Sequence, residues 1–593
     1  MNKTGYILGI ARGHNAGACL LKDGKIVFSL EEERLSRQKY DGGPYATMIK
    51  VKEYTDKLDY IFVSHTQSLQ DTAGKVDYTG DDVYTGLARK LGLIERKADL
   101  RNHPQIIDFS HSHHKIHAAI AFYRSGFSDA VAVIVDGAGT MYPAMFDSQQ
   151  VILWETETVF DCSYPANFKT VYKHLGCKEP IVGHYNYNEN SEKFGEQGTH
   201  IEFISGNAGI TKVYEAVTEY CGFSSIEAGK TMGLFPYGND NKQIPSLFLN
   251  SQVAPISDRN VIIPRYPNGA IVNASMYSEL QPISDKDITK CQNRRDLAYA
   301  CQTQTQAQVL QLIKQAVELT GKKQVVLSGG YALNCVANYY YLKTLRDEGI
   351  ELYVEPVSND GGTAIGVALW GYHQLTQSTE THPREIYLGP QYDYTDKVEY
   401  IAEKYSGTVE DCDNSKVVEL LRKKNIVAMF QGRSENGPRA LGNRSLLFDP
   451  TFKDGKDYVN GVKHREYFRP FAGSILEEDV HEWFDLRGMD SSPHMMYAVN
   501  CQPGVEDKIP SIIHVDGTCR IQTVNKDENL YYYNLIKEFK EQTGIPMVFN
   551  TSFNLGGEPL VETLDDALWT LQQSDIEYLY LPEYKKLIKI ANQ

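Results

Sequence analysis

Two segments of this chain, which begin about 125 residues apart, contain the same succession of strand-like runs and tight turns. The apolar, β-prone runs of the first segment are residues 6–11, 16–21 and 25–30. Those of the second segment are residues 130–135, 141–146 and 151–156. In each segment the first turn is polar and contains glycine, and Asp23-Gly24 in the first segment is a strong hairpin signal. The pattern predicts two copies of a β-hairpin unit, that is, an internal duplication.

Duplicated units of this kind are typical of the actin-like ATPase fold, which has a ribonuclease-H-like topology, and of sugar kinases. In those folds the two glycine-bearing turns face each other across a cleft and bind phosphates through backbone N–H groups. Two further strand ends carry glycines, at 328–330 and at 358–362, where a ligand could approach the backbone closely. The first part of the chain is therefore predicted to be a duplicated, actin-like α/β domain.

A polar stretch at residues 372–392 indicates a linker, so a second domain is expected to follow it. The chain has 593 residues, and a domain typically spans about 100–200, so two to four domains are expected. We predict a first domain at residues 1–378 and a second at residues 386–593. The charged fraction of 23% and the aromatic fraction of 11% are ordinary for globular proteins and exclude a disordered chain.

The chain is acidic, with a formal net charge of −16, which argues against general binding of duplex nucleic acid or of anionic membranes. The window 421–470 is an exception, because it holds eleven lysines and arginines against five acidic residues. Its arginines lie among glycine, proline and phenylalanine, and arginines in buried surroundings need an anion to neutralise them. The window therefore predicts an anion-binding pocket, although a solvated basic face would give the same count.

A histidine cluster suggests a metal site. His113 and His117 are four residues apart, so on a helix they share one face and could hold one cation. Asp136 and Asp360 each follow a strand at a glycine turn, where the fold would direct both carboxylates into the same cleft. Two imidazoles with carboxylates and open positions suit Fe(II) or a similar divalent ion. The alternative is that these histidines lie at the surface or are hydrogen-bonded in the core.

His14 lies in the first hairpin turn, between Gly13 and Asn15. A histidine in a phosphate-facing turn could be a general base or a phosphate ligand. A turn residue without a functional role is equally compatible with the sequence.

The sequence contains no run of about 18 apolar residues and therefore no predicted transmembrane helix. Its first residues, MNKTGYILGIARGHN, lack the long apolar stretch of a signal peptide. The ten cysteines never occur at C-x-x-C spacing, so zinc-ribbon and thioredoxin-like sites are not expected. We predict a cytoplasmic protein with reduced cysteines and no membrane partner.

Eleven motifs spread over almost the whole chain resemble those of one enzyme family. In the first region they are GHNAGACLLKDGKI, EEERLSRQK, HHKIHAA, VDGAGT, GKTMGLFPYG, SGGYALN and NDGGTA. In the second region they are QGRSENGPRALGNRS, KHREYFRPFAGSIL, HVDGTCRIQT and FNTSFNLGGEPLVET. The chain resembles the O-carbamoyltransferases of antibiotic and nodulation-factor biosynthesis, and the order of the motifs is that of the family.

The resemblance implies a first domain like the actin-type domain of tRNA threonylcarbamoyl-transferase proteins and a second, YrdC-like α/β domain. The second domain would use carbamoyl phosphate and ATP, the latter with Mg²⁺ where required, to make carbamoyl-adenylate. The first domain would transfer the carbamoyl group to a hydroxyl and release AMP. Alternatives are an actin-fold sugar kinase and a non-catalytic partner protein in tRNA modification.

The resemblance also implies roles for individual residues. His14 would act on the acceptor hydroxyl or on the carbamoyl group. The metal, usually Fe(II), would be held by His113, His117, Asp136 and Asp360. Candidate nucleotide and carbamoyl-adenylate contacts are Lys39, Gly137, Gly329, Gly330, Asn334 and Gly361. Candidate contacts of carbamoyl phosphate and ATP in the second domain are Arg439, Arg444, Arg469, Arg520, Asn550 and Ser552.

The chain departs from the family at Asn15, where the family usually has aspartate, so a charged partner for His14 is missing at this position. The acceptor is expected to be a hydroxylated small molecule or a hydroxymethylated pyrimidine in a nucleotide or in DNA. The basic stretch 88–103 and the polar stretch 183–200 could contact it, but a solvated helix face and a surface loop are the favoured interpretations. The many aromatic residues would suit a homo-oligomer interface and a core equally well.

Overall fold

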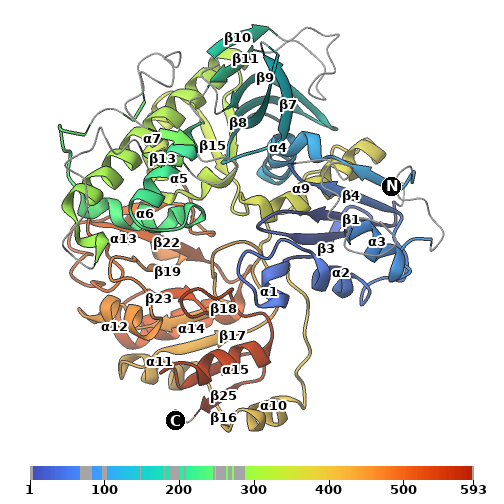
Figure 1. Cartoon of the computed structure of the whole chain (residues 1–593). Helices are drawn as coiled ribbons and strands as arrows, with labels where there is room; N and C mark the ends of the chain where they lie inside the picture. The colour runs from blue at the N-terminus through green and yellow to red at the C-terminus, as the bar shows by residue number, and fades with distance from the viewer. Residues whose placement is uncertain are drawn as a thin grey trace. The chain divides into compact units, whose positions relative to one another are not determined.

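A computed structural model describes residues 4–66, 83–95, 103–146, 148–177, 182–186, 201–205, 209–244, 247–248, 262–264, 270–272 and 287–590. The chain divides into two compact units. Unit 1 consists of residues 1–32 and 40–384, and unit 2 consists of residues 33–39 and 385–593 (Figure 1). Residues 33–39, which we call the strap, therefore belong to unit 2 although segments of unit 1 precede and follow them in the sequence.

The first sheet of unit 1 has five strands in the order β3-β2-β1-β4-β5. The strands are β1 (Tyr6–Ala11), β2 (Gly17–Lys22), β3 (Lys25–Glu31), β4 (Tyr60–Ser64) and β5 (Ile106–Asp108). The first three are antiparallel neighbours, and β4 and β5 extend the sheet in parallel from β1. The predicted hairpin turn joins β2 to β3, and Asp23 and Gly24 both have positive φ, as a type I′ turn requires.

The second sheet of unit 1 repeats this order as β9-β8-β6-β14-β15. Its strands are β6 (Asp129–Val135), β7 (Met141–Phe146), β8 (Gln149–Ser163), β9 (Asn167–Gly176), β10 (Val182–Asn186), β11 (Ile201–Ser205), β14 (Gln324–Ser328) and β15 (Glu351–Val354). As in the first sheet, β6 has an antiparallel neighbour on one side, β8, and a parallel neighbour on the other, β14. The predicted actin-like duplication is confirmed.

One detail of the predicted second hairpin unit is wrong. The sequence pattern makes residues 141–146 the hairpin partner of β6, but β7 pairs with the first half of β8, from Gln149 to Trp154. The second half of β8, from Glu157 to Ser163, is the antiparallel neighbour of β6. β8 has 15 residues and is long enough to pair with both strands. Strand-like runs identify strands, but they do not determine which part of a long strand pairs with which neighbour.

Two buried helices lie between the sheets of unit 1. α9 (Thr363–Thr376) packs against β1, β2 and β4, and α4 (His113–Ser125) packs against β6 and β14. The two helices also pack against each other, closely enough that a Cβ added at Gly366 would lie 2.5 Å from the carbonyl oxygen of Ile116. A side chain at position 366 would therefore separate the helices that carry or adjoin the candidate metal ligands.

Further helices complete unit 1. They are α2 (Tyr45–Val51), α3 (Val83–Lys90), α5 (Ile210–Tyr220), α6 (Ala228–Leu234), α7 (Gln292–Thr320) and α8 (Cys335–Asp347). The short strands β12 (Ile262–Pro264) and β13 (Ala270–Val272) pair with each other. The helix α7 has 29 residues and carries charged and glutamine side chains along its length.

No helix in the described part of the chain is long and apolar enough to cross a membrane.

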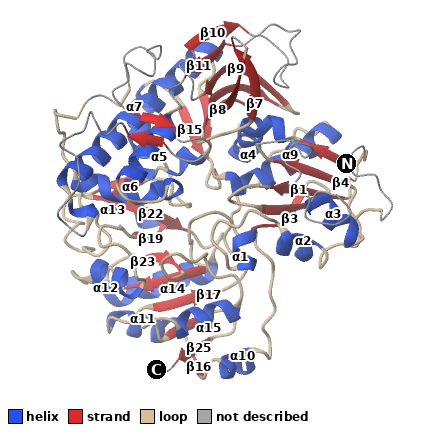
Figure 2. Cartoon of the chain, viewed as in Figure 1, coloured by secondary structure: helices blue, strands red, loops and turns tan. Residues whose placement is uncertain are grey.

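Unit 2 is an α/β unit built on one mixed sheet with the strand order β16-β25-β24-β17-β18-β23-β19-β22-β21-β20 (Figure 2). The strands are β16 (Gly407–Asp411), β17 (Val427–Phe430), β18 (Arg444–Phe448), β19 (Ala472–Leu476), β20 (Phe484–Asp485), β21 (Ala498–Cys501), β22 (Thr518–Val524), β23 (Met547–Ser552), β24 (Tyr578–Leu581) and β25 (Lys586–Ile590). The helices are α1 (Glu32–Ser36), most of which belongs to the strap, α10 (Val398–Lys404), α11 (Asn414–Arg422), α12 (Gly455–Val462), α13 (Val480–Trp483), α14 (Leu530–Thr543) and α15 (Leu564–Gln572). Leu421 of α11 and Phe539 of α14 belong to the same buried core cluster as strands of the sheet. The α/β class predicted for this domain is confirmed.

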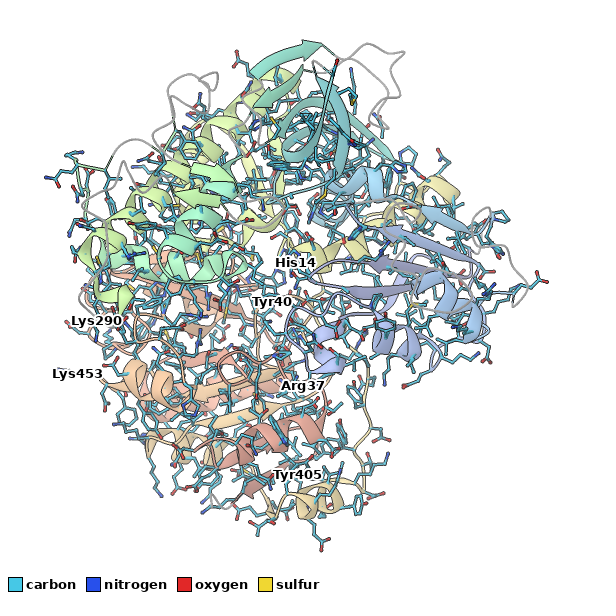
Figure 3. All side chains as sticks on the ribbon, viewed as in Figure 1. His14, Arg37, Tyr40, Lys290, Tyr405 and Lys453 are labelled. Carbon is cyan, nitrogen blue, oxygen red and sulfur yellow. The ribbon has the colours of Figure 1, made fainter. Side chains whose placement is uncertain are left out.

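The strap is held in unit 2 by two arginines. Arg34 is almost fully buried, and its guanidinium donates to the carbonyl oxygens of Glu435 at 3.2 Å and Gly437 at 2.8 Å. Arg37, labelled in Figure 3, donates to the carbonyl oxygens of Leu560 at 2.7 Å and Pro559 at 3.1 Å. These four bonds fix a segment whose sequence neighbours on both sides belong to unit 1.

A buried histidine pair at the end of α9 is expected to make the stability of unit 1 depend on pH. The Nε2 atoms of His373 and His382 lie 2.9 Å apart, and the ring of His373 stacks on Tyr123 with 3.9 Å between the ring centroids. Burial lowers the pKa of His373 to about 4 and that of His382 to about 3, and the positive charges of His373 and Arg124 also lower the pKa of His382.

The unfolded chain should therefore bind protons between about pH 6.5 and pH 4 that the folded unit cannot bind. We expect the free energy of unfolding to fall by about 2 kcal/mol per histidine when the pH is lowered from 7 to 5. The double variant His373→Asn/His382→Asn should lose part of this pH dependence in urea unfolding at pH 7 and pH 5. His111→Asn, at an exposed position, should keep all of it. Equal slopes in the double variant and the wild type would contradict the assignment.

Candidate functional site

The four candidate metal ligands converge in unit 1. His113 and His117 lie one turn apart on α4, Asp136 follows β6, and Asp360 begins the short 3-10 turn that precedes α9. One potential ligand atom from each residue lies within 4.8 Å of the other three. We call these four residues the His–Asp cluster. Three of them are buried, and Asp360 is half-buried.

The separations within the His–Asp cluster fit a single divalent ion. The Nε2 atoms of the two histidines are 3.1 Å apart. His113 Nε2 lies 3.5 Å from a carboxylate oxygen of Asp136 and 3.5 Å from one of Asp360, and His117 Nε2 lies 3.5 Å from the same Asp360 oxygen. Two nitrogens bound to one metal at about 2.1 Å would lie about 3.0–3.4 Å apart, depending on the coordination geometry.

The cluster also has the electrostatics of a cation site. Burial alone would lower the pKa of His113, but the carboxylates of Asp360 and Asp136 outweigh this effect and raise it to about 10. Burial likewise opposes the ionisation of both aspartates, yet the neighbouring histidines hold the pKa of each carboxyl below its usual range. Asp136 and Asp360 are therefore ionised and stabilise positive charge at this point. The N–H of Gly330 donates to Asp136 at 3.0 Å and orients its carboxylate.

His14, labelled in Figure 3, lies on the turn that follows β1. Its Nδ1 is 3.7 Å from a carboxylate oxygen of Asp360, and its side chain is 53% exposed. His14 is thus both close to the candidate metal ligands and accessible to a substrate. Asn15 beside it is buried.

The candidate nucleotide contacts are divided between the two units. Gly137 and Gly361 directly follow Asp136 and Asp360 in sequence, and Gly329 and Gly330 follow β14. The side-chain oxygen of Asn334 accepts from the N–H of Ala337 at 3.1 Å and caps α8. Lys39 is on the strap and belongs to unit 2, where its ammonium lies 2.6 Å from Glu33.

A second candidate site lies in unit 2, where Lys463, Arg465, Arg469 and Arg520 form what we call the basic cluster. Burial lowers the pKa of Lys463 well below its usual value, and the charges of Arg465 and Arg469 lower it further. The pKa of Arg465 is likewise lowered by burial and then by Arg469 and Arg520. Close cations in a poorly solvated position repel one another, and a bound anion would relieve that repulsion.

The strands of unit 2 position other predicted contacts beside these cations. Arg520 on β22 and Asn550 on β23 both stand opposite Ala472 of β19. Lys463 donates to the carbonyl oxygen of Ser552 and lies 3.4 Å from its hydroxyl. Half-buried Arg439 precedes Ala440, whose carbonyl accepts from Asn550 at 3.2 Å. Sequence reasoning did not single out Lys463, although its position in the KHREYFRP run was an available signal.

Arg444 has a structural role. It is fully buried, and its guanidinium donates to the carbonyl oxygens of Gln431 at 2.6 Å, Asn443 at 3.0 Å, Glu562 at 3.2 Å and Gly432 at 3.2 Å. It also stacks on the ring of Phe430 at 3.8 Å. These bonds use its donors within the protein, so the geometry does not favour Arg444 as a substrate contact.

The two stretches considered for acceptor binding fall largely outside the described residues. Of the basic stretch 88–103, residues 96–102 lie outside them, and α3 ends at Lys90. Of the polar stretch 183–200, residues 187–200 lie outside them. Whether these stretches contact the acceptor or are, as favoured above, a solvated helix face and a surface loop stays a prediction.

Comparison with known proteins gives matches over most of the chain. Residues 60–369 match the family model described as carbamoyltransferase N-terminus, and residues 418–586 match the model described as carbamoyltransferase C-terminus. The chain is 29% identical to nodulation protein NolNO of Sinorhizobium fredii over 96% of its own length and 78% of the relative's. It is also 29% identical to nodulation protein NolO of Bradyrhizobium diazoefficiens over 79% of its length and 77% of the relative's.

Two solved structures are also similar. A full-length HypF in its phosphate- and nucleotide-bound form has a TM-score of 0.34 and 14% identity, covering 64% of this chain and 48% of HypF. A ROK hexokinase from Thermus thermophilus has a TM-score of 0.28 and 12% identity, covering 63% of this chain and 100% of the hexokinase.

Proposed function

The chain belongs to the carbamoyltransferase family, and we propose that it is an ATP-dependent O-carbamoyltransferase that acts on a hydroxyl of a small-molecule acceptor. In the first step carbamoyl phosphate, ATP and water give carbamoyl-adenylate, phosphate and pyrophosphate. In the second step the acceptor oxygen attacks the carbamoyl carbon, the bond to the adenylate oxygen breaks, and AMP leaves. The hydroxyl proton passes to a base.

The first step is assigned to unit 2, and the observation that supports this assignment is the basic cluster. Carbamoyl phosphate, ATP and pyrophosphate are all polyanions, and guanidinium groups bind phosphate oxygens through two parallel N–H bonds. Arg465, Arg469 and Arg520 would bind and orient these anions, and Lys463 would add a point charge. Lys39, which the strap brings into unit 2, would contact a nucleotide phosphate.

The second step is assigned to unit 1. His14 is accessible and close to the His–Asp cluster, so it would accept the proton of the acceptor hydroxyl as the oxygen attacks. The N–H groups of the turns that follow Asp136 and Asp360 would bind the adenylate phosphate. Asn15 cannot supply the negative charge that a family aspartate would place beside His14. Asp360, 3.7 Å from His14 Nδ1, would be the carboxylate partner of the imidazole instead.

His113, His117, Asp136 and Asp360 would hold a divalent metal ion, because their donor set, separations and charge fit one. The family resemblance implies Fe(II). When bound, such an ion supplies Lewis-acid stabilisation of phosphate charge.

A small-molecule acceptor is favoured over DNA by two observations. The net charge of −16 opposes general binding to nucleic acid. In addition, the similar proteins NolNO and NolO are named as nodulation proteins, and the family resemblance connects such proteins with hydroxylated small molecules.

Product analysis tests the proposal directly. With carbamoyl phosphate, ATP and a panel of hydroxylated acceptors, we expect AMP, pyrophosphate and an acceptor that has gained one carbamoyl group by mass spectrometry. Formation of pyrophosphate should require carbamoyl phosphate. ADP with a phosphorylated acceptor would indicate a sugar kinase, and no turnover would indicate a binding partner. A carbamoylated hydroxymethylpyrimidine nucleotide or DNA, with activity that falls steeply with salt, would replace the small-molecule acceptor.

A further inference from the structure

The helix that carries both histidines of the His–Asp cluster is not capped by its own sequence. Ser112 occupies the N-cap position of α4 but makes no side-chain capping bond. The first N–H groups of α4, which have no partner within the helix, donate instead to residues of other elements. The N–H of His113 donates to the hydroxyl of Thr140 at 3.1 Å, and the N–H of His114 donates to the carboxylate of Glu155 at 3.4 Å. The position of this helix end therefore depends on Thr140 and Glu155.

Glu155 also binds the turn that follows Asp136. The carboxylate oxygen that faces α4 accepts from the N–H of Thr140 at 2.8 Å. The backbones of the same residues are joined, because Glu155 N–H donates to Thr140 at 3.1 Å and Gly139 N–H donates to Glu155 at 2.9 Å. A Cβ added at Gly139 would lie 2.6 Å from this carboxylate, so the turn passes too close for a side chain. One carboxylate thus links the element that carries His113 and His117 to the turn that begins at Asp136.

The charge of Glu155 is balanced by Lys173 of β9, at 2.8 Å. Both side chains are buried, with exposed fractions of 0% and 1%. Burial alone would raise the pKa of Glu155, but the charge of Lys173 outweighs it and holds the carboxyl ionised. A buried ion pair is costly to desolvate and is often no more stabilising than apolar residues of the same size. Its presence is better explained by what the carboxylate positions than by stability.

We propose that Glu155, held by Lys173, is a positioning residue that fixes the N-terminus of α4 relative to the Asp136 turn and so sets the geometry of the metal ligands. This inference rests on the metal site of the proposed function. A negative charge at a helix N-terminus is stabilised by the helix dipole, and here the anchored helix end presents two of the ligands. Residues that orient metal ligands typically change metal affinity by about 10–100-fold when they are replaced.

The test is metal binding by the double variant Glu155→Gln/Lys173→Met, compared with the wild type in the intact chain. Both substitutions keep the side-chain length approximately constant, and replacing both residues avoids an unpaired buried charge. Co(II) is the probe, because its visible absorption reports the geometry of its ligands. We expect an affinity for Co(II) at least about tenfold weaker, with a changed absorption spectrum.

Glu157→Gln is the matched control. Glu157 is also buried on β8, but its carboxylate accepts from the N–H of Ile210 on α5 and pairs with His174. The Glu157→Gln variant should bind Co(II) with the affinity and the absorption spectrum of the wild type. If the double variant instead binds Co(II) like the wild type and only its free energy of unfolding changes, the pair is structural and the inference is wrong. If the wild type itself does not bind Co(II), the proposed metal site fails and the inference fails with it.

Discussion

Replacing His113 and His117 together by alanine should reduce carbamoyl transfer to the acceptor by at least about a hundredfold, whereas pyrophosphate release driven by carbamoyl phosphate should persist. The reason is that both side chains belong to the His–Asp cluster of unit 1, and the first step is assigned to the basic cluster of unit 2. The two steps can be measured separately, as pyrophosphate release without acceptor and as AMP and carbamoylated product with acceptor. Metal content should fall in parallel with transfer.

Two controls make this result specific. His111→Ala, two residues before the cluster and exposed, should leave both steps unchanged. Asp136→Asn keeps the size of the side chain, so it leaves no large cavity, but it removes one of the two negative charges of the His–Asp cluster. It should therefore also lose carbamoyl transfer. Retention of transfer in the double histidine variant, or loss of both steps together in a folded protein, would refute the division of labour between the units.

Arg465→Met should impair the first step instead. Pyrophosphate release driven by carbamoyl phosphate should fall by about a hundredfold or more. Arg465 lies among the cations of the basic cluster. Its guanidinium makes a long contact of 3.5 Å with the hydroxyl of Thr551. Removing its charge relieves repulsion in the empty site. In phosphate-free buffer the variant should therefore be at least as stable to urea as the wild type. Inorganic phosphate should raise the melting temperature of the wild type more than that of the variant.

Arg444→Met provides the contrast, because the same substitution in the same basic window should act on stability. Four backbone carbonyl oxygens would lose their donor, and an unsatisfied buried polar group costs about 1–3 kcal/mol. We expect a destabilisation of about 3 kcal/mol or more. If Arg465→Met proved as destabilising as Arg444→Met, or left the first step intact, the basic cluster would not be an anion site.

The first sheet shows how far local sequence determines topology. Asp23-Gly24 specifies a two-residue turn, so the pairing of β2 with β3 follows from adjacent residues alone. The second sheet was less predictable, because β8 divides its length between β6 and β7. That division depends on which half of a 15-residue strand meets each neighbour, and a strand-like run in the sequence carries no information about this.

The candidate site shows the same limit. The spacing of His113 and His117 predicted a shared helix face, and strand ends predicted where Asp136 and Asp360 would lie, because these are consequences of secondary structure. The composition of the window 421–470 could not separate Arg444, which binds carbonyl groups, from Arg465, which lies among cations. Glu155 and Lys173 gave no signal either, since charged residues within strands usually face solvent.

The strap has a consequence for dividing the protein. Because residues 33–39 belong to unit 2 and residues 40–384 to unit 1, the backbone passes between the units three times. No single cut in the chain yields two complete halves. A fragment beginning at residue 385 would lack Arg34 and Arg37, and the four carbonyl oxygens that they bind would lose their donors. A complete second half consists of two separate segments, residues 33–39 and 385–593, which a fusion of the strap to the larger segment could supply as one polypeptide.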